Sequence, residues 1–94
     1  MIRDTLLKMK FPSPIGMRQR FILIDVATYE EPYRKGTAEI AIKIGASKVY
    51  TARAVRNLVN RGLLNRTLEE TADGQKIRTL TLSDELKKRI EEAE

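Results

Sequence analysis

Hydrophobic residues in the middle of the chain recur at a helical spacing, in two runs that a glycine separates. The first run is Ile40, Ala41 and Ile44, and the second is Val55, Leu58 and Val59. Gly45 can take the left-handed conformation that ends a helix, and Ser47 can cap the next helix by accepting from its first N–H groups. The pattern predicts a helix-turn-helix over residues 37–62, whose second helix covers about Ser47–Arg61.

Before this motif, the pattern predicts a helix over residues 14–31 and a weaker segment over residues 1–12. Ser13 is placed to cap the helix, and Pro14 suits its first position, where a missing N–H is no loss. The weaker segment fits a short helix or a frayed terminus equally well. The connector that follows residue 31 is compatible with a short edge strand, and Thr37 is expected to cap the first helix of the motif.

After the motif, residues 63–82 alternate between apolar and polar positions on either side of a turn signal. The signal is Asp73-Gly74, since both residue types tolerate the positive φ of tight hairpin turns. We expect a β-hairpin whose apolar face packs on the helices, because an isolated two-stranded ribbon is marginal in water. Ser83 is placed to cap a last helix over residues 83–94, with acidic residues in its first turn.

The central motif resembles a known family. The sequence IAIKIGASKVYTARAVRNLVNRGLL resembles the winged helix-turn-helix of small bacterial, archaeal or archaeal-virus transcription regulators, notably the MarR-like group. The shared features are an aliphatic-Ala pair at Ile40-Ala41, a glycine turn at residues 44–47 and a Leu-x-x-x-Gly-Leu pattern at residues 58–63. Thr51 stands where the family pattern has a buried valine, and Tyr50 where it commonly has a small hydroxyl residue.

This resemblance implies a fold class and a partner. The expected fold is a single α+β domain over residues 1–94, mostly helical, with a three-helix core, a two- or three-stranded β-wing and a C-terminal helix. The recognition helix, about Ser47–Arg61, would enter the major groove of double-stranded DNA, and the wing would contact the backbone or the minor groove. In the resembling regulators, terminal helices build a dimer.

The distribution of charge supports an anionic partner. The 94 residues carry a net charge of +5, from 18 basic and 13 acidic residues. Residues 34–66 contain eight basic residues and one acidic residue, whereas residues 83–94 contain three basic and five acidic residues. The positive charge is therefore concentrated on the helix-turn-helix, as expected of a nucleic-acid interface. A solvated surface that happens to be basic is the simpler alternative.

The residue types argue against most catalytic chemistry. The chain has no Cys and no His, which excludes disulfides, the usual zinc sites and thiol or imidazole catalysis. No glycine-rich phosphate loop is present. The adjacent acidic pairs, Glu30-Glu31, Glu69-Glu70 and Glu91-Glu92, are better explained as solvated faces than as acid–base pairs. We therefore expect no enzyme activity, no cofactor and no metal.

The residues expected to bind DNA lie on the recognition helix and on the hairpin. Arg and Asn side chains can pair with guanine and adenine edges, and the capped start of the helix can approach a phosphate. The candidates are Ser47, Lys48, Tyr50, Arg53, Arg56, Asn57, Arg66, Lys76 and Arg78. Alternatives stay open for several: Arg56 and Arg61 fit a merely solvated surface equally well, Tyr50 fits packing on the domain, and the hairpin charges fit protection of a strand edge.

These observations favour a sequence-specific DNA-binding transcription regulator. We expect a homodimer, because the apolar residues of the two terminal segments exceed what one small domain should hide; they are Ile2, Leu6, Leu7, Leu86 and Ile90. A protein–protein adaptor in a transcription or replication complex and a non-specific chromatin protein are the alternatives. No membrane span or signal peptide is evident, so the expected location is the cytoplasm, on the nucleoid; a small-molecule effector is left unassigned.

Overall fold

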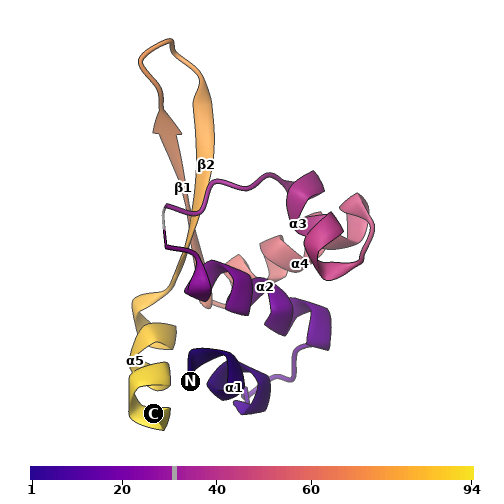
Figure 1. Cartoon of the computed structure of the whole chain (residues 1–94), viewed down its shortest axis with the longest axis vertical. Coiled ribbons are helices and arrows are strands. Elements are labelled where there is room, and N and C mark those ends of the chain that lie inside the picture. Colours follow the sequence, from indigo (N-terminus) through magenta and orange to yellow (C-terminus); the bar gives the residue numbers. More distant parts are fainter. Residues whose placement is uncertain (31) are drawn as a thin grey trace.

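The chain folds as helices followed by a hairpin and a last helix (Figure 1). The computed structural model describes residues 1–30 and 32–94, so Glu31, the last residue of the predicted helix 14–31, lies outside the described residues. The helix itself ends at Thr28, earlier than predicted. The elements are α1 (Ile2–Lys8), α2 (Met17–Thr28), α3 (Thr37–Ile44), α4 (Lys48–Asn60), β1 (Leu64–Glu70), β2 (Lys76–Leu82) and α5 (Asp84–Ala93). This order confirms the mostly helical α+β class with a winged helix-turn-helix.

The turn between α3 and α4 follows the sequence signals. Gly45 has φ 69°, and Ala46 donates its N–H to the carbonyl of Ala41 at 3.0 Å. This left-handed residue ends α3, as expected of a glycine after a helix. The Ser47 hydroxyl accepts from the N–H of Tyr50 at 3.0 Å, so the predicted cap of the recognition helix is confirmed.

The starts of α2 and α3 differ from the prediction. Gly16, not Ser13, precedes the first residue of α2, and Gly36, not Thr37, precedes α3; neither start has a side-chain cap. Ser13 stays outside the helix, where its carbonyl accepts from Arg61 Nη1 at 2.7 Å. The hydroxyl of Thr37 accepts from Arg78 Nη2 at 3.2 Å instead of capping its own helix.

The first twelve residues begin with a true helix rather than a frayed terminus. Nη1 of Arg20 donates to three carbonyls at the end of α1, those of Leu6 (2.8 Å), Leu7 (3.3 Å) and Met9 (2.6 Å). These carbonyls have no partner within a helix of this length, so one guanidinium from α2 satisfies them. This contact fixes α1 against α2.

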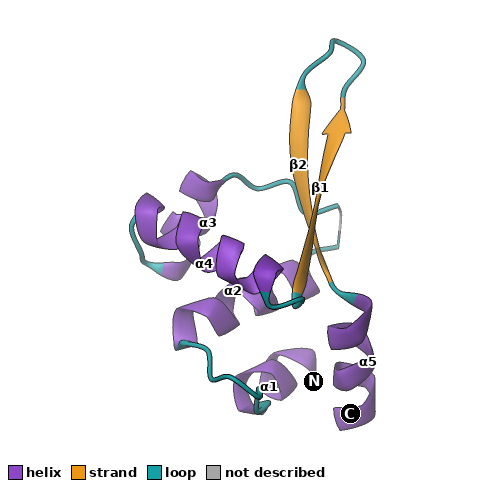
Figure 2. Ribbon diagram, turned by 180° about the vertical axis from the view of Figure 1, so that it is seen from behind, coloured by secondary structure: helices purple, strands orange, loops and turns teal. Residues whose placement is uncertain are grey.

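The terminal helices close the core of the domain. Figures 1 and 2 show α1 and α5 on the same side of α2, next to both ends of the chain. The Thr5 hydroxyl donates to Glu94 at 3.1 Å, and Arg89 Nη2 donates to the Lys10 carbonyl at 2.7 Å. Three of the five residues expected at a dimer interface, namely Leu6, Leu86 and Ile90, are buried within the single chain. The surplus of apolar surface expected from the sequence is therefore largely absent.

The wing, residues 63–82, is an antiparallel hairpin that projects from the helices (Figure 2). Leu64 pairs with Leu82 at its buried base, whereas Leu68 near the tip is 69% exposed, so only the base of its apolar face packs on the helices. Tyr33 adds one isolated bridge to Leu80 rather than a third strand. At the tip, residues 71–75 join the two strands, and of the pair Asp73-Gly74 only Gly74 has positive φ (86°).

Candidate nucleic-acid interface

One face of α4 builds the core, and the opposite face is open. The buried residues of the helix are Thr51, Ala54, Val55 and Leu58. The exposed residues are Lys48, Val49, Tyr50, Arg53, Arg56, Asn57 and Asn60. Residues three and four apart lie on the same side of a helix, so Val49, Arg53, Arg56 and Asn60 form a single stripe opposite the core. We call these four residues the outer stripe.

The outer stripe includes two residues that the sequence analysis missed. Val49 is 66% exposed although it is apolar, and Asn60 is exposed in the last turn. The signal that could have found them was the spacing itself, since both continue the i, i+4 and i+7 series through Arg53 and Arg56. Asn57 and Tyr50 lie on one flank of the outer stripe, and Lys48 lies on the other.

A threonine is tolerated at position 51, where the family pattern has a buried valine, because its hydroxyl has a hydrogen-bond partner. Its side chain is 0% exposed, and its hydroxyl donates to the carbonyl of Ser47 at 2.8 Å. A buried hydroxyl is costly only when it lacks a partner, and the carbonyl four residues earlier supplies one. Threonine therefore fills the position of a buried valine without disturbing the start of the recognition helix.

Tyr50 has one side against the start of α2. Its hydroxyl would lie 3.9 Å from a Cβ atom placed on Gly16, and the guanidinium carbon of Arg18 lies 5.8 Å from the centre of its ring. The side chain is still 38% exposed. The ring thus packs on the domain while its outer edge stays open to a partner. Packing on the domain and contact with a partner, the two alternatives for Tyr50 from the sequence, are therefore compatible.

The basic residues of the wing differ in how far they are engaged. Arg66 is exposed, and Lys76 is exposed opposite Glu70 in the strand register. Arg78 is half-buried and donates to Thr37 at the start of α3. Its guanidinium therefore joins the wing to the helix-turn-helix. Arg66 and Lys76 are therefore the basic residues of the hairpin that remain exposed.

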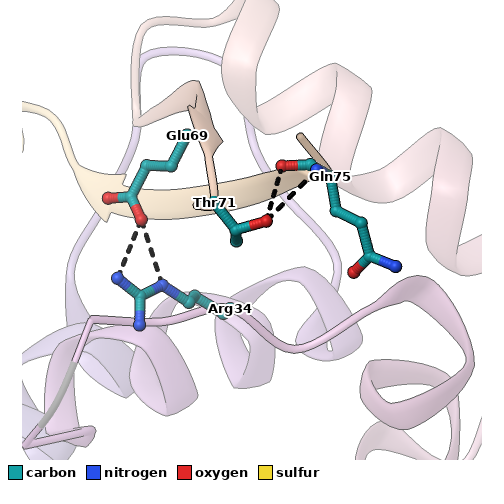
Figure 3. Close-up of polar contacts among 4 residues, drawn as sticks. All are labelled: Arg34, Glu69, Thr71 and Gln75. Atoms are coloured by element: carbon teal, nitrogen blue, oxygen red, sulfur yellow. Dashed lines mark hydrogen bonds and ion pairs between the residues drawn. The ribbon is translucent and has the colours of Figure 1, made fainter. Parts of the chain in front are cut away.

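One acidic residue of the wing pairs with a basic residue of the connector before α3. Glu69 accepts from both Nε and Nη2 of Arg34, at 3.1 and 2.8 Å (Figure 3). This ion pair is exposed on both sides, so it contributes little to stability but removes one of the eight basic residues counted in residues 34–66. At the tip, a hydrogen bond from the Thr71 hydroxyl and another from the N–H of Gln75 hold the pKa of Asp73 below its usual value.

Three arginines outside the interface bind the connector between α1 and α2. Arg20 donates to Met9, Arg89 donates to Lys10, and Arg61 donates to Ser13 and, at 3.2 Å, to Pro14. The guanidinium carbons of Arg20 and Arg89 also lie 5.1 and 5.2 Å from the centre of the Phe11 ring. The charge of Arg61, at the end of the recognition helix, therefore serves the fold.

Two further expectations concern ligands and membranes. Within the described ranges, no three acidic, His or Cys side chains are grouped so that they could hold a metal ion. None of the helices in residues 1–30 and 32–94 has the length and hydrophobicity that a bilayer crossing requires.

Solved structures match this arrangement of helices and wing. No protein-family model and no curated protein sequence matches the chain significantly. A variant of ZitR from Lactococcus lactis, in complex with DNA, matches with a TM-score of 0.63 and 23% identity over 92% of this chain and 56% of ZitR. The zinc-dependent MarR family transcriptional regulator AdcR, in its Zn(II)-bound state, matches with a TM-score of 0.58 and 19% identity over 93% of this chain and 57% of AdcR.

The fold is a winged helix, and these solved structures share it. The ST1889 protein of the thermoacidophilic archaeon Sulfolobus tokodaii has it too, with a TM-score of 0.58 and 19% identity over 84% of this chain and 72% of that protein. The chain spans about half the length of ZitR and AdcR. AdcR is a zinc-dependent regulator, whereas these 94 residues contain no Cys and no His.

Proposed function

We propose that the chain is a sequence-specific, double-stranded DNA-binding transcription regulator. The observation that carries the proposal is the outer stripe of α4. Among the described residues, Arg53 and Arg56 have no hydrogen-bond or ion-pair partner, and the buried side of the same helix anchors them to the core. An exposed helix face with unpaired arginines on a rigid support suits the major groove.

The chemistry of the outer stripe suits base edges. An arginine can donate two hydrogen bonds to guanine, asparagine can pair with adenine, and a small apolar side chain can contact the methyl group of thymine. Arg53 lies at the centre of the stripe, with Val49 and Asn60 one helical turn or more to either side. We therefore assign direct base reading to Arg53, with Arg56, Asn57 and Asn60 as further contacts. Lys48 and the capped start of α4, at Ser47, approach the backbone.

The wing contributes contacts to the backbone or the minor groove. Arg66 and Lys76 are the accessible cations of the hairpin, and Arg78 keeps the hairpin in place against α3. ZitR, which shares this fold, has been crystallised in complex with DNA, and AdcR is a transcriptional regulator. These two proteins support the proposal by their fold. A regulator of this kind acts in the cytoplasm, on the nucleoid.

We also propose that the protein acts as a homodimer. Two linked recognition helices make the second DNA contact intramolecular, which raises affinity without new contacts. Because Leu6, Leu86 and Ile90 are buried, the interface would use the apolar surface that the start of the chain leaves accessible: Met1 is exposed, and Ile2 and Leu7 pack against the core but are only half-buried. The dimer therefore rests on the avidity argument more than on exposed apolar area.

The adaptor alternative has one observation in its favour. Ile42 on α3 is 84% exposed, and Leu68 on the wing is also exposed, so apolar contact points are present outside the basic stripe. The wing has three acidic residues beside its three basic ones, which weakens it as an electrostatic surface. A protein partner would use such apolar points, whereas DNA would use the arginines.

Selection of bound sequences from random duplex DNA tests the proposal. Binding of the selected duplex is then titrated at several salt concentrations, beside a random duplex. We expect one enriched sequence and an affinity that falls steeply with salt, because each neutralised phosphate releases counterions. Binding without enrichment would indicate the chromatin protein, and no binding at low salt would favour the adaptor.

A further inference from the structure

The arginines of this chain fall into two groups. Those that donate to a carbonyl, hydroxyl or carboxylate are Arg20, Arg34, Arg61, Arg78 and Arg89. Those without such a partner in residues 1–30 and 32–94 are Arg3, Arg18, Arg53, Arg56 and Arg66. Three members of the second group belong to the proposed DNA interface. Arg18 has no hydrogen-bond or ion-pair partner among the described residues, and its contact in this part of the chain is with the ring of Tyr50.

Arg18 lies against the recognition helix although it belongs to α2. Its guanidinium carbon is 5.8 Å from the centre of the Tyr50 ring, and Tyr50 is in the first turn of α4. Both side chains are exposed. The ring can restrict the conformations of the arginine without neutralising it, since a cation stacked on an aromatic face keeps its charge and its N–H donors.

The position of Arg18 complements that of the wing. Figure 1 shows that α2 and α4 begin on the same side of the molecule, and that the wing leaves from the end of α4. Arg18 therefore lies by the N-terminal end of the recognition helix, and Arg66 and Lys76 extend from its C-terminal end. A helix in the major groove has phosphates on both sides, so cations at both ends can bind the backbone.

We propose that Arg18 is a phosphate-binding residue of the DNA interface, held in place by the ring of Tyr50. This inference rests on the DNA-binding function proposed above and extends the interface from α4 and the wing to the start of α2. Because a phosphate carries no base identity, Arg18 contributes affinity and orientation rather than sequence preference.

The experiment compares Arg18→Ala with Arg3→Ala, which removes the same charge from α1. Arg3 lies on α1 and lines a hollow with Asp25 and Lys43, away from the ring of Tyr50 on which Arg18 is stacked. Fluorescence anisotropy measures binding to the selected and the random duplex over a salt series. We expect Arg18→Ala to weaken both duplexes by the same factor and to lower the slope of log K against log salt by about 0.9. Arg3→Ala should leave the slope unchanged.

A second pair of variants tests the role of the ring. Tyr50→Ala should reproduce part of the loss, and Arg18→Ala should cost less in the Tyr50→Ala background than in the wild type, because the two side chains act together. Circular dichroism melting curves check that each variant is folded.

The outcomes separate this inference from the function on which it rests. Wild-type protein that binds neither duplex overturns both. Wild-type protein that binds, with an unchanged salt slope in Arg18→Ala, overturns the assignment of Arg18 alone. A loss confined to the selected duplex would make Arg18 a base-reading residue and would also overturn it.

Discussion

Nη1 of Arg61 donates a 2.7 Å hydrogen bond to the carbonyl of Ser13, 48 residues earlier in the chain. The contact joins the end of the recognition helix to the connector that precedes α2. Ser13 itself lies three residues before Gly16, the residue at the start of α2. The contact also gives the charge of Arg61 a structural partner, although the local sequence suggests a DNA contact.

Arg61→Ala should therefore lower stability more than DNA affinity. We expect the free energy of unfolding to fall by about 1–2 kcal/mol, since two backbone carbonyls lose a charged donor at a partly solvated site. Arg56→Ala is the matched control, because Arg56 is exposed and has no partner among the described residues; it should change stability by less than about 0.5 kcal/mol. Urea denaturation measures both. Equal midpoints for the two variants would contradict this assignment.

A second prediction concerns the contact between Tyr33 and Asp25. The buried Tyr33 hydroxyl donates to Asp25, whose carboxylate also lies 3.5 Å from Lys35 Nζ. Tyr33→Phe removes one donor from a largely buried carboxylate and should cost about 1.5–3 kcal/mol of unfolding free energy. Tyr29→Phe is the control, because it keeps the edge-on ring contact with Tyr33 (5.3 Å between centroids) and removes only an exposed hydroxyl. A loss of similar size in both variants would argue against the hydrogen bond.

The same tyrosine should make stability depend on alkaline pH. Burial, together with the neighbouring Asp25 carboxylate, raises the pKa of Tyr33 above its usual value. Above about pH 10 an unfolded tyrosine loses its proton while the folded one keeps it, so the unfolded state binds fewer protons and stability falls as pH rises. The contribution is fully present below that pH. Melting temperatures between pH 9 and 11.5 should fall less in Tyr33→Phe than in Tyr29→Phe; parallel curves would refute the assignment.

The structural features that the sequence predicted correctly depend on residues that are close together in the chain. The end of α3 at Gly45, and the caps at Ser47 and Ser83, each need only a side chain and a backbone group a few residues away, and all three are present. The turn signal at Asp73-Gly74 also lies in the loop that joins the two strands. Local patterns fix these features because the hydrogen-bond partners are close in the chain.

The features that the sequence did not predict depend on distant partners. Ser13 and Thr37 are good capping residues, but Gly16 and Gly36 precede the two helices. The hydroxyl of Thr37 and the carbonyl of Ser13 are instead bound by Arg78 and Arg61, from far along the chain. Leu6 is buried because α1 folds back onto α2, and no local sequence pattern predicts this packing. The same holds for the candidate site, because Arg18 reaches the recognition helix only through tertiary packing. The spacing of residues in α4 predicted which of its side chains are exposed, but it did not predict which side chains from other elements lie beside them.

A fourth prediction separates base reading from backbone binding. Arg53→Ala should cost about 1–3 kcal/mol on the selected duplex and much less on random DNA, because Arg53 is at the centre of the outer stripe. Lys76→Ala on the wing should weaken both duplexes similarly and flatten the salt dependence. Parallel anisotropy titrations of the two variants measure this difference. If Arg53→Ala weakens both duplexes by the same factor, Arg53 binds the backbone.

The last prediction concerns the homodimer. A two-fold dimer would place its recognition helices about one DNA turn apart, roughly 34 Å, so the selected sequences should be inverted repeats with that spacing. Light scattering across a concentration series should show a mass that rises from 10.8 kDa towards twice that value. The full chain must be used, because Leu86 and Ile90 close the core and a chain that ends at Ser83 would lose them. Randomising one half-site should weaken binding by about 10²-fold or more, since the second contact is then no longer intramolecular. A mass of 10.8 kDa at every concentration, with a single unrepeated half-site, would show that the protein binds DNA as a monomer.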